Sequence, residues 1–333
     1  LAGLGKLIAG TDDGLVDIDS LLTAVSRQPD DSFKVLALIK SAKELYNNSE
    51  YQAAIDLCEK SLQTAKTIQY EMGQAESYFL MARSNNKLNK SATALEFFNE
   101  AQRIFQKHRR IDRLASLYNN VGLIYKNLGR FSNAVQFLSR AYEYYSRIKD
   151  QRGAASTSNN LGSVYLRLGN YEKSAEAYFN SLKLFEELDL LPGIDGINSN
   201  LAVLFSDQKD YDRALDHCNF ALEIFQQLDD KRQTANLLNN IAEIHINLKE
   251  TSKALDILKN SYSLYSEIQD RQGIASTLNN LGIVYKEQGD YKRAFNSHLE
   301  ALNIFVELNQ LGQTPRVYNH IDDALILQGQ YDD

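Results

Sequence analysis

The stretch NNVGLIYKNLGRFSNA, residues 119–134, recurs as NNLGSVYLRLGNYEKS at 159–174 and as NNLGIVYKEQGDYKRA at 279–294. The spacing is a constant 40 residues, and a fixed period of this length is the signature of a repeat architecture. Repetition therefore decides the fold before any division of the 333 residues by length. A column of small residues runs through the repeats: Ala54, Ala94, Ala134, Ala214, Ala254 and Ala294.

Each repeat contains two helices, because apolar residues recur at helical spacing twice within every period. Gly129 and its equivalents stand where the first helix must end, since a left-handed residue is least costly as Gly. Lys209 and Lys249 occupy this place in two repeats, where we expect a tighter or more strained turn. Asp150, Asp230 and Asp270 are the expected N-caps. First helices are expected near 34–48, 71–88, 111–128, 151–168, 191–208, 231–248, 271–288 and 314–328, and second helices from about residues 51, 91, 131, 171, 211, 251 and 291.

The sequence predicts an all-α protein, a right-handed superhelical solenoid of helix-turn-helix units. Only 3 prolines interrupt the chain, and helix-forming residues fill the stretches between the glycines. Residues 1–33 are expected to form a leader with a capping helix near 16–27, and residues 34–333 an array of seven repeats plus a truncated eighth. Tyr331 matches Tyr291 as the first residue of a second helix, so the chain is expected to be a segment of a larger protein. The alternative is that the last helix serves as an imperfect cap.

Composition excludes several classes of function. A formal net charge of −7 argues against binding to a nucleic-acid backbone. No apolar run is long enough to insert into a membrane. Cys58 and Cys218 occupy equivalent repeat positions, which favours small core residues over a disulfide. The compartment, cytoplasmic or periplasmic, stays open, since Leu1 follows no initiator Met.

Enzymatic activity is not expected. The five histidines are scattered over different repeats, and the chain has no H-E-x-x-H, no Cys-His cluster and no glycine-rich phosphate loop. The repeated glycines are helix ends. We therefore expect no cofactor, no metal and no catalytic residues.

The repeat columns resemble the tetratricopeptide repeat. Gly122, Tyr125, Ala134, Leu138 and Ala141 stand at that family's spacing, and the resemblance covers residues 34 to 330. The usual unit has about 34 residues, whereas this one has 40. It is therefore similar to the long-repeat subgroup found in spindle-orientation adaptors, kinesin light chains and many bacterial regulators.

The stretch that opens at Asp19 resembles the start of sensor regions in bacterial tetratricopeptide histidine kinases and related regulators. In those proteins such an array precedes a membrane helix and an output domain. The resemblance implies a scaffold that binds a protein or peptide in its concave groove, as the sensing or docking region of a bacterial signalling regulator.

The expected groove is lined by a column of asparagines on the first helices. A carboxamide pairs with both the C=O and the N–H of an extended peptide, whatever its side chains. The column resembles the asparagine ladder of O-GlcNAc transferase, which implies that its members grip a peptide backbone. These residues are Asn120, Asn160, Asn200, Asn240 and Asn280, joined by the preceding column of Asn119, Asn159, Asn239 and Asn279 and, one turn further along, by Lys126 and Lys286.

One alternative for these amides remains open at this point. The amides could instead bond to neighbouring helices, since buried polar groups must be satisfied. In each pair of consecutive asparagines, one member would then face the partner and the other would lie inside the stack. The carboxylate-clamp pattern of matched Lys and Arg residues is absent, which makes a C-terminal acidic motif an unexpected ligand.

A second function, from a different class, is a structural adaptor that self-associates through the C-terminal half repeat. A third, an aspartate-phosphatase-like or quorum-peptide receptor, requires an N-terminal effector domain, for which residues 1–30 are too short.

Overall fold

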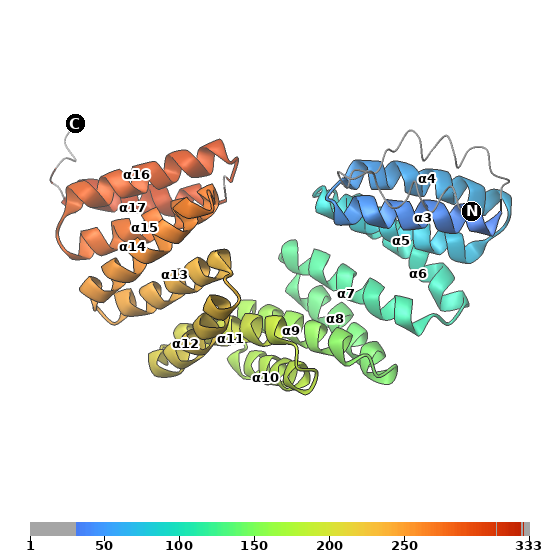
Figure 1. The fold of residues 1–333 in the computed structure, drawn as a ribbon, viewed down its shortest axis with the longest axis horizontal. Coiled ribbons are helices and arrows are strands. Elements are labelled where there is room, and N and C mark those ends of the chain that lie inside the picture. The colour runs from blue at the N-terminus through green and yellow to red at the C-terminus, as the bar shows by residue number, and fades with distance from the viewer. Residues whose placement is uncertain (1–30, 311, 328, 330–333) are drawn as a thin grey trace. The chain divides into compact units, whose positions relative to one another are not determined.

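The computed structural model describes residues 31–310, 312–327 and 329 (Figure 1). Within these residues fifteen α-helices follow one another and no strand occurs. The expected all-α class and the helix-turn-helix repeats are thereby confirmed. The expected capping helix at 16–27 and Tyr331 lie outside the described residues.

The chain divides into two compact units, Leu1–Leu168 and Gly169–Asp333, a division that the repeat pattern did not predict. The boundary falls in the turn inside one repeat. The described helices of unit 1 are α3 (Ser32–Asn47), α4 (Tyr51–Thr67), α5 (Glu71–Lys87), α6 (Ser91–Lys107), α7 (Ile111–Asn127), α8 (Phe131–Arg147) and α9 (Gln151–Arg167).

Unit 2 continues the same alternation of first and second helices. Within it, each first helix also contacts the next first helix, as α13 does α15 and α15 does α17, so these helices form a continuous wall. The described helices of unit 2 are α10 (Tyr171–Glu187), α11 (Leu191–Asp207), α12 (Tyr211–Gln227), α13 (Lys231–Asn247), α14 (Thr251–Glu267), α15 (Arg271–Glu287), α16 (Tyr291–Glu307) and α17 (Thr314–Leu327).

Helix starts follow the capping chemistry expected from the sequence. The carboxylates of Asp150, Asp230 and Asp270 each accept a hydrogen bond from the backbone N–H three residues further on, at 2.8–3.1 Å. These bonds satisfy N–H groups that have no partner within the helix. The three predicted N-caps are confirmed.

The turns inside the repeats are uniformly left-handed. Gly129 has φ +69° and Gly289 φ +80°, which confirms their role as helix ends. Lys209 and Lys249 adopt the same conformation, with φ 61° and 63°. Their turns are therefore no tighter than the glycine turns, and the cost lies in holding a residue with a Cβ in the left-handed region.

The core of each repeat is formed where the second helix packs on the first. The six alanines of the small-residue column are all 0% exposed. Gly122 leaves room for Leu138, because a Cβ there would lie 2.6 Å from Leu138 Cγ. The predicted small-residue positions therefore set how closely the two helices approach.

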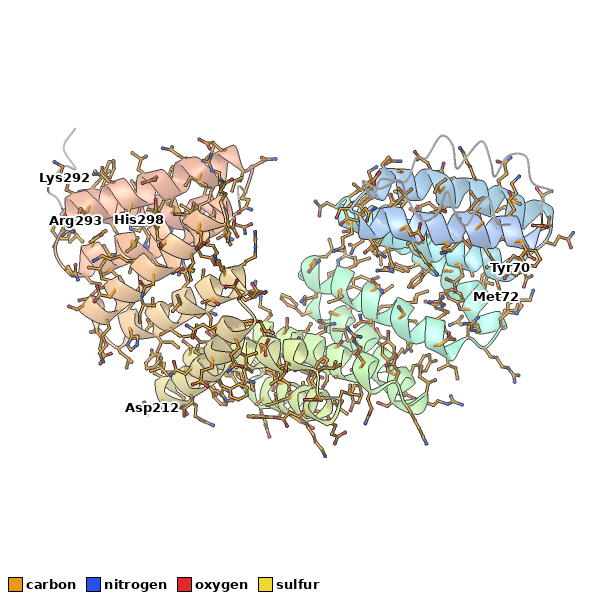
Figure 2. The ribbon with its side chains drawn as sticks, viewed as in Figure 1. Tyr70, Met72, Asp212, Lys292, Arg293 and His298 are labelled. Atoms are coloured by element: carbon orange, nitrogen blue, oxygen red, sulfur yellow. The ribbon has the colours of Figure 1, made fainter. Side chains whose placement is uncertain are left out.

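The start of α16 packs on the end of α15 through a cation–π contact. The Arg293 guanidinium carbon lies 4.5 Å from the centroid of the Tyr285 ring. Figure 2 labels Arg293 beside Lys292 on this part of the chain. Arg213 lies 4.2 Å from the Phe205 ring at the equivalent junction two repeats earlier, at the start of α12. These two contacts cover the turn inside their repeats.

None of the helices within the described ranges combines the length and the apolar character needed to cross a bilayer.

Candidate functional site

The expected asparagines all lie on first helices, at one position of each repeat. Asn239 and Asn279 are buried, and the other seven are half-buried. In α11 the first member of the pair is replaced by Ser199. Asn119 and Asn120 lie on α7, Asn159 and Asn160 on α9, Asn200 on α11, Asn239 and Asn240 on α13, and Asn279 and Asn280 on α15.

In unit 1 the amides of neighbouring repeats bond to each other. Asn160 Nδ2 donates to Asn119 Oδ1 at 3.1 Å, and the Thr157 hydroxyl donates to the same oxygen at 3.3 Å. Asn120 Nδ2 donates to the Ser116 carbonyl of its own helix at 2.8 Å. The donors of both second members are thus used within unit 1.

Lys126 also points at the neighbouring repeat. Its Nζ donates to Ser163 Oγ at 3.4 Å, from α7 to α9. Burial, and then the charge of Arg167, lower the pKa of the Lys126 ammonium below its ordinary value. Lys126 therefore supplies a partly desolvated cation on this wall.

In unit 2 the first member of each pair is bonded inside the stack. Asn239 Nδ2 donates to Thr277 Oγ1 at 2.9 Å, and Thr277 Oγ1 lies 3.2 Å from Asn239 Oδ1. The Thr277 hydroxyl also lies 2.9 Å from the Gly273 carbonyl. Asn239, only 8% exposed, therefore ties α13 to α15.

Asn279 is held from the second helix of its own repeat. Its Oδ1 lies 3.1 Å from Nδ1 of His298, which is 0% exposed on α16. The His298 ring stacks on the His320 ring of α17, with centroids 5.1 Å apart. Burial, and then His320 and Lys286, lower the pKa of His298 to about 4, so the ring is neutral at neutral pH.

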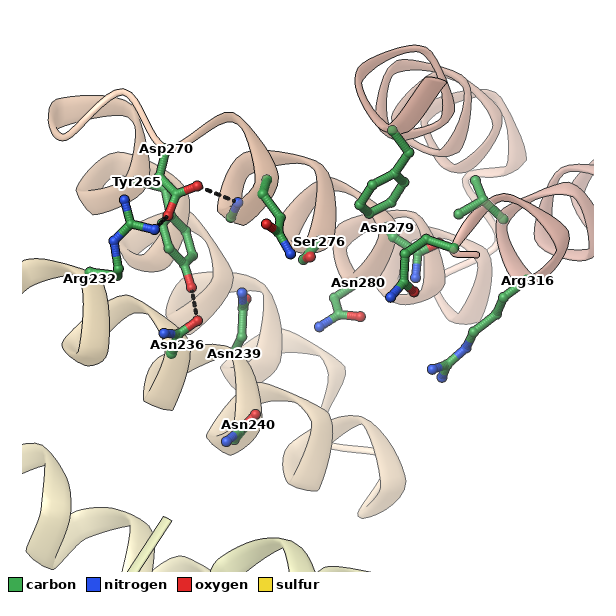
Figure 3. A pocket seen from close by; sticks show the side chains of 15 residues that line it. Arg232, Asn236, Asn239, Asn240, Tyr265, Asp270, Ser276, Asn279, Asn280 and Arg316 are labelled. Atoms are coloured by element: carbon green, nitrogen blue, oxygen red, sulfur yellow. Dashed lines mark hydrogen bonds and ion pairs between the residues drawn. The ribbon is translucent and has the colours of Figure 1, made fainter. Parts of the chain in front are cut away.

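A polar cavity of about 500 Å³ lies on the wall of first helices in unit 2 (Figure 3). This volume is within the range of small-ligand and peptide-side-chain pockets. Seven of the fifteen lining side chains are carboxamides, and they include both asparagine pairs of α13 and α15. The lining carboxamides are Asn236, Asn239, Asn240, Gln272, Asn279, Asn280 and Gln313.

Asn240 and Asn280 are the uncommitted members of the two asparagine pairs that line the cavity. Within the described part of the chain, neither side chain makes a hydrogen bond. Both are half-buried, and both line the cavity. Their donors and acceptors are therefore available to a ligand, whereas Asn239 and Asn279 support the wall beneath.

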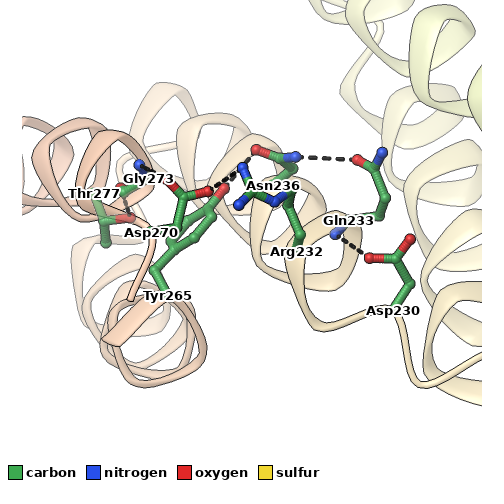
Figure 4. A network of polar contacts seen from close by, with 8 residues as sticks. All are labelled: Asp230, Arg232, Gln233, Asn236, Tyr265, Asp270, Gly273 and Thr277. Carbon is green, nitrogen blue, oxygen red and sulfur yellow. Dashed lines mark hydrogen bonds and ion pairs between the residues drawn. The ribbon is translucent and has the colours of Figure 1, made fainter. Parts of the chain in front are cut away.

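One end of the cavity is fixed by a polar network (Figure 4). Arg232 Nη1 lies 2.6 Å from Asp270 Oδ2, and the other oxygen of Asp270 caps α15. The Tyr265 hydroxyl donates to Asn236 Oδ1 at 2.5 Å, and Asn236 in turn donates to Gln233 at 3.0 Å. Burial raises the pKa of Tyr265 to about 12, so this phenol stays a donor.

Several lining residues were not predicted from the sequence, although one signal was present. Asn236, Ser276 and Arg316 share a single repeat position, one turn before the second asparagine of the pair. Lys286, which was predicted, is not among the cavity residues; its Nζ lies 3.0 Å from Asp323 Oδ2. Asn200 and Asn159 lie on the wall of first helices outside this cavity.

The cysteines behave as core residues. Cys58 and Cys218 are both free and 0% exposed, and burial raises the pKa of each thiol to about 12. Among the described residues no three His, Cys, Asp or Glu side chains are grouped to hold a metal ion.

The fold matches solved structures at low sequence identity. A signal transduction ATPase with a tetratricopeptide repeat sensor from Pyrococcus horikoshii matches with TM-score 0.71 and 18% identity, over 90% of this chain and 46% of that one. This chain therefore spans under half of that ATPase. The apo quorum sensor NprR from B. thuringiensis matches with TM-score 0.72 and 17% identity, over 86% and 80% of the two chains.

Another similar structure is a Rap protein complexed with competence and sporulation factor, with TM-score 0.60 and 12% identity over 99% and 97% of the chains. At such identities these likenesses show the fold alone. No curated protein sequence matches this chain. The family model for the tetratricopeptide repeat, however, matches residues 113–187, 194–267 and 233–307, more than half of the sequence. The chain belongs to the tetratricopeptide repeat family.

Proposed function

We propose that this chain is a peptide-binding scaffold whose first helices hold an extended segment of a partner protein. The observation that carries the proposal is the pair Asn240 and Asn280. Their amides are uncommitted and half-buried in one polar cavity of unit 2. Because these amides are already half-buried, a ligand that pairs with them displaces little water from the site.

The chemistry fits a peptide backbone better than a small apolar ligand. Carboxamides on successive first helices offer donors and acceptors in the same pattern as a peptide's N–H and C=O groups. Asn239 and Asn279 contribute by fixing α13 and α15, through Thr277 and His298. Hydrogen bonds to the peptide backbone give an affinity that depends little on the partner's side chains.

Unit 1 contributes through the same repeat positions, but the side chains there already form hydrogen bonds within the unit. We propose that Asn120, Asn160 and Lys126 contact the peptide only after giving up bonds within the unit, which lowers their share of the affinity. Asn119 and Asn159 belong to the proposed face of unit 1, and Asn200 belongs to that of unit 2.

Similar folds support a role in signalling. NprR is described as a quorum sensor, the Rap protein is complexed with competence and sporulation factor, and the signal transduction ATPase carries a tetratricopeptide repeat sensor. We propose that this chain is the sensing or docking region of a bacterial signalling regulator and that it acts without catalysis. Its ligand is a peptide or a protein segment, and neither a nucleic acid nor a membrane.

The test starts with peptides selected from a phage-displayed random library on the immobilised full chain. Their affinity is measured by fluorescence anisotropy for the wild type and for Asn240→Ala/Asn280→Ala. Loss of two hydrogen bonds is expected to weaken binding by about ten- to a hundredfold. Circular dichroism and the Tm should stay unchanged, because neither side chain bonds within the described fold.

Two results count against the proposal. One is a library that yields no peptide with saturable binding. The other is a double variant that binds every selected peptide as tightly as the wild type does.

Self-association remains the second candidate, and α17 provides its motivation. Tyr318, Ile326 and Leu327 are each 51% exposed on this helix, which is the last one described. Sedimentation over a wide concentration range tests it, and a constant monomer mass at high concentration excludes it.

A further inference from the structure

The two arginines of the polar cavity differ in how their charges are matched. Arg232 is paired with Asp270, whose carboxylate is also used as an N-cap. Arg316, in the first turn of α17, is exposed and makes no ion pair within the described residues. Asp270 is the only carboxylate among the lining residues that the structure describes, so the α17 end of the cavity carries an unmatched positive charge.

Asn279 adds directed donors to the same cavity. Its Oδ1 is occupied by His298, which leaves the Nδ2 group as the free part of the amide. Asn279 is 9% exposed and lines the cavity beside Asn280. The Nδ2 group of Asn279 can therefore offer hydrogen-bond donors to the cavity.

His298 fixes this orientation through its tautomer. A carboxamide oxygen only accepts, so the bond to Asn279 Oδ1 requires the proton on Nδ1 of His298. Nε2 of His298 is buried with no hydrogen-bond partner, and Gly282 leaves room for that edge of the ring. A flipped Asn279 would present its Nδ2 to this N–H group, and the bond would then form only if the proton moved to Nε2.

Arg316 supplies the complementary charge across the cavity. Figure 3 shows its side chain at the α17 side of the cavity, with Asn279 and Asn280 on the neighbouring helix. A guanidinium and amide donors together suit an anionic, planar acceptor. The first turn of α17 adds the positive end of a helix dipole to the same place.

We propose that the α17 end of this cavity receives the carboxylate of an aspartate or glutamate side chain of the bound peptide, between Arg316 and the Asn279 amide. His298 is a positioning residue for Asn279. The inference rests on the proposed function, because it names the chemistry of a peptide held at the same site.

An internal acidic side chain fits better than a chain terminus. Binding of a terminal carboxylate needs cationic side chains at equivalent positions of successive first helices. In this cavity Arg316 is the one guanidinium without an ion-pair partner among the described residues. The uncommitted amides Asn240 and Asn280 line the same cavity, so the peptide backbone has partners beyond the acidic residue.

The test uses peptides selected on the full chain, synthesised with free and with amidated C-termini. An acidic residue is expected at one position of the selected sequences. Changing it to Asn or Gln should weaken binding to the wild type about tenfold or more, and Arg316→Gln should weaken the acidic peptide to the same extent. Lys292→Gln, an equal loss of charge on the exposed start of α16, is the matched control and should bind normally.

A charge swap makes the pairing specific. Arg316→Glu should reject the acidic peptide and accept the peptide whose acidic residue is replaced by Lys, so a double-mutant cycle should return a favourable coupling. His298→Leu, the residue found at the equivalent Leu258, should weaken binding several-fold. His298→Asn keeps an N–H near the place of Nδ1 and should restore binding.

The outcomes separate the two proposals. Selected peptides that bind through Asn240 and Asn280, but show no acidic preference and no loss with Arg316→Gln, overturn the acidic subsite and leave the peptide scaffold standing. Binding that is abolished by amidation and not by replacing the acidic side chain assigns the cavity to a chain terminus and also overturns it. Failure of every peptide to bind overturns the scaffold itself.

Discussion

The two units use one motif in two ways. In both, an asparagine bonds to the threonine of the next first helix, as Asn119 does with Thr157 and Asn239 with Thr277. In unit 1, however, Asn160 also donates to Asn119, whereas Asn280 makes no such bond within the described residues of unit 2. The same dipeptide therefore closes the wall in one unit and leaves two amides facing a cavity in the other.

This difference shows that the repeat position determines where an amide lies, whereas the neighbouring side chains determine whether that amide is available to a ligand. In unit 1 the hydrogen bond from Asn160 to Asn119 joins two neighbouring repeats and occupies the second asparagine. In unit 2 the supporting bonds go to Thr277 and His298, so Asn240 and Asn280 are spared. The predictions that follow test this separation between a shared scaffold and a site specific to unit 2.

The largest expected effect is a pH dependence of unit 2 that unit 1 does not share. Folding lowers the pKa of His298 from 6.5 to about 4. The neutral ring therefore contributes full stability above pH 6.5, and the contribution is lost as the pH falls toward 4, by about 3 kcal/mol at most. The only histidine on the described helices and turns of unit 1 is His108, which is exposed.

Urea unfolding of the wild type and of His298→Leu at pH 7 and pH 4.5 measures this contribution. The free energy of unfolding of the wild type should fall more steeply on acidification than that of the variant. Parallel losses in the two proteins would show that His298 does not carry the effect.

A second prediction concerns a buried acid that breaks the repeat pattern. Asp195 is 0% exposed, both of its carboxylate oxygens lack hydrogen-bond partners, and burial raises its pKa to about 6. Ala155 of unit 1 and Ala235 of unit 2 occupy the same repeat position. Asp195→Ala should therefore stabilise the protein by about 2 kcal/mol at pH 7.

The pH dependence of the Asp195 penalty provides a control. A raised carboxyl pKa destabilises the fold above pH 6, and the penalty disappears as the pH falls below 3.8. The Tm advantage of Asp195→Ala should thus shrink on acidification. An advantage that is equal at pH 7 and pH 4 would point to side-chain packing instead of charge.

A third prediction compares the structural asparagines directly. Asn239→Ala removes a buried amide that bridges α13 and α15, and about 1–2 kcal/mol of stability should be lost. Asn119→Ala in unit 1 removes a half-buried one and should cost about 1 kcal/mol or less. Chemical denaturation of the two variants measures both, and a larger loss for Asn119→Ala would contradict the assigned burial.

The smallest expected effect is on stability and concerns the left-handed turns inside the repeats. Lys249 holds the left-handed conformation that Gly129 holds in unit 1. Lys249→Gly relieves that strain but adds freedom to the unfolded chain, for a net gain of about 0.5 kcal/mol. Differential scanning calorimetry measures the gain, and Gly129→Lys is the matched loss; a Lys249→Gly variant that melts lower would show that the lysine stem packs usefully.

Much of the fold could be predicted from the sequence because its determinants are local. The period of 40 residues, the helical spacing and the N-caps Asp150, Asp230 and Asp270 fix where each helix starts and ends. The division into two units could not be predicted, because the repeat pattern continues unchanged across Gly169.

The site was predicted in part. The period placed Asn240 and Asn280 on one wall, but which amides are already bonded depends on contacts between helices that no local pattern records. Arg316 was missed because its column changes chemistry from Asn236 through Ser276 to Arg316, so it forms no visible ladder.

The most direct test of the central claim is the NMR spectrum of the asparagine side-chain amides during titration with a selected peptide. The account predicts that the Asn240 and Asn280 Nδ2 resonances shift most and saturate with the measured affinity, while those of Asn120 and Asn160 shift less. Saturable peptide binding that leaves the Asn240 and Asn280 signals in place would contradict it.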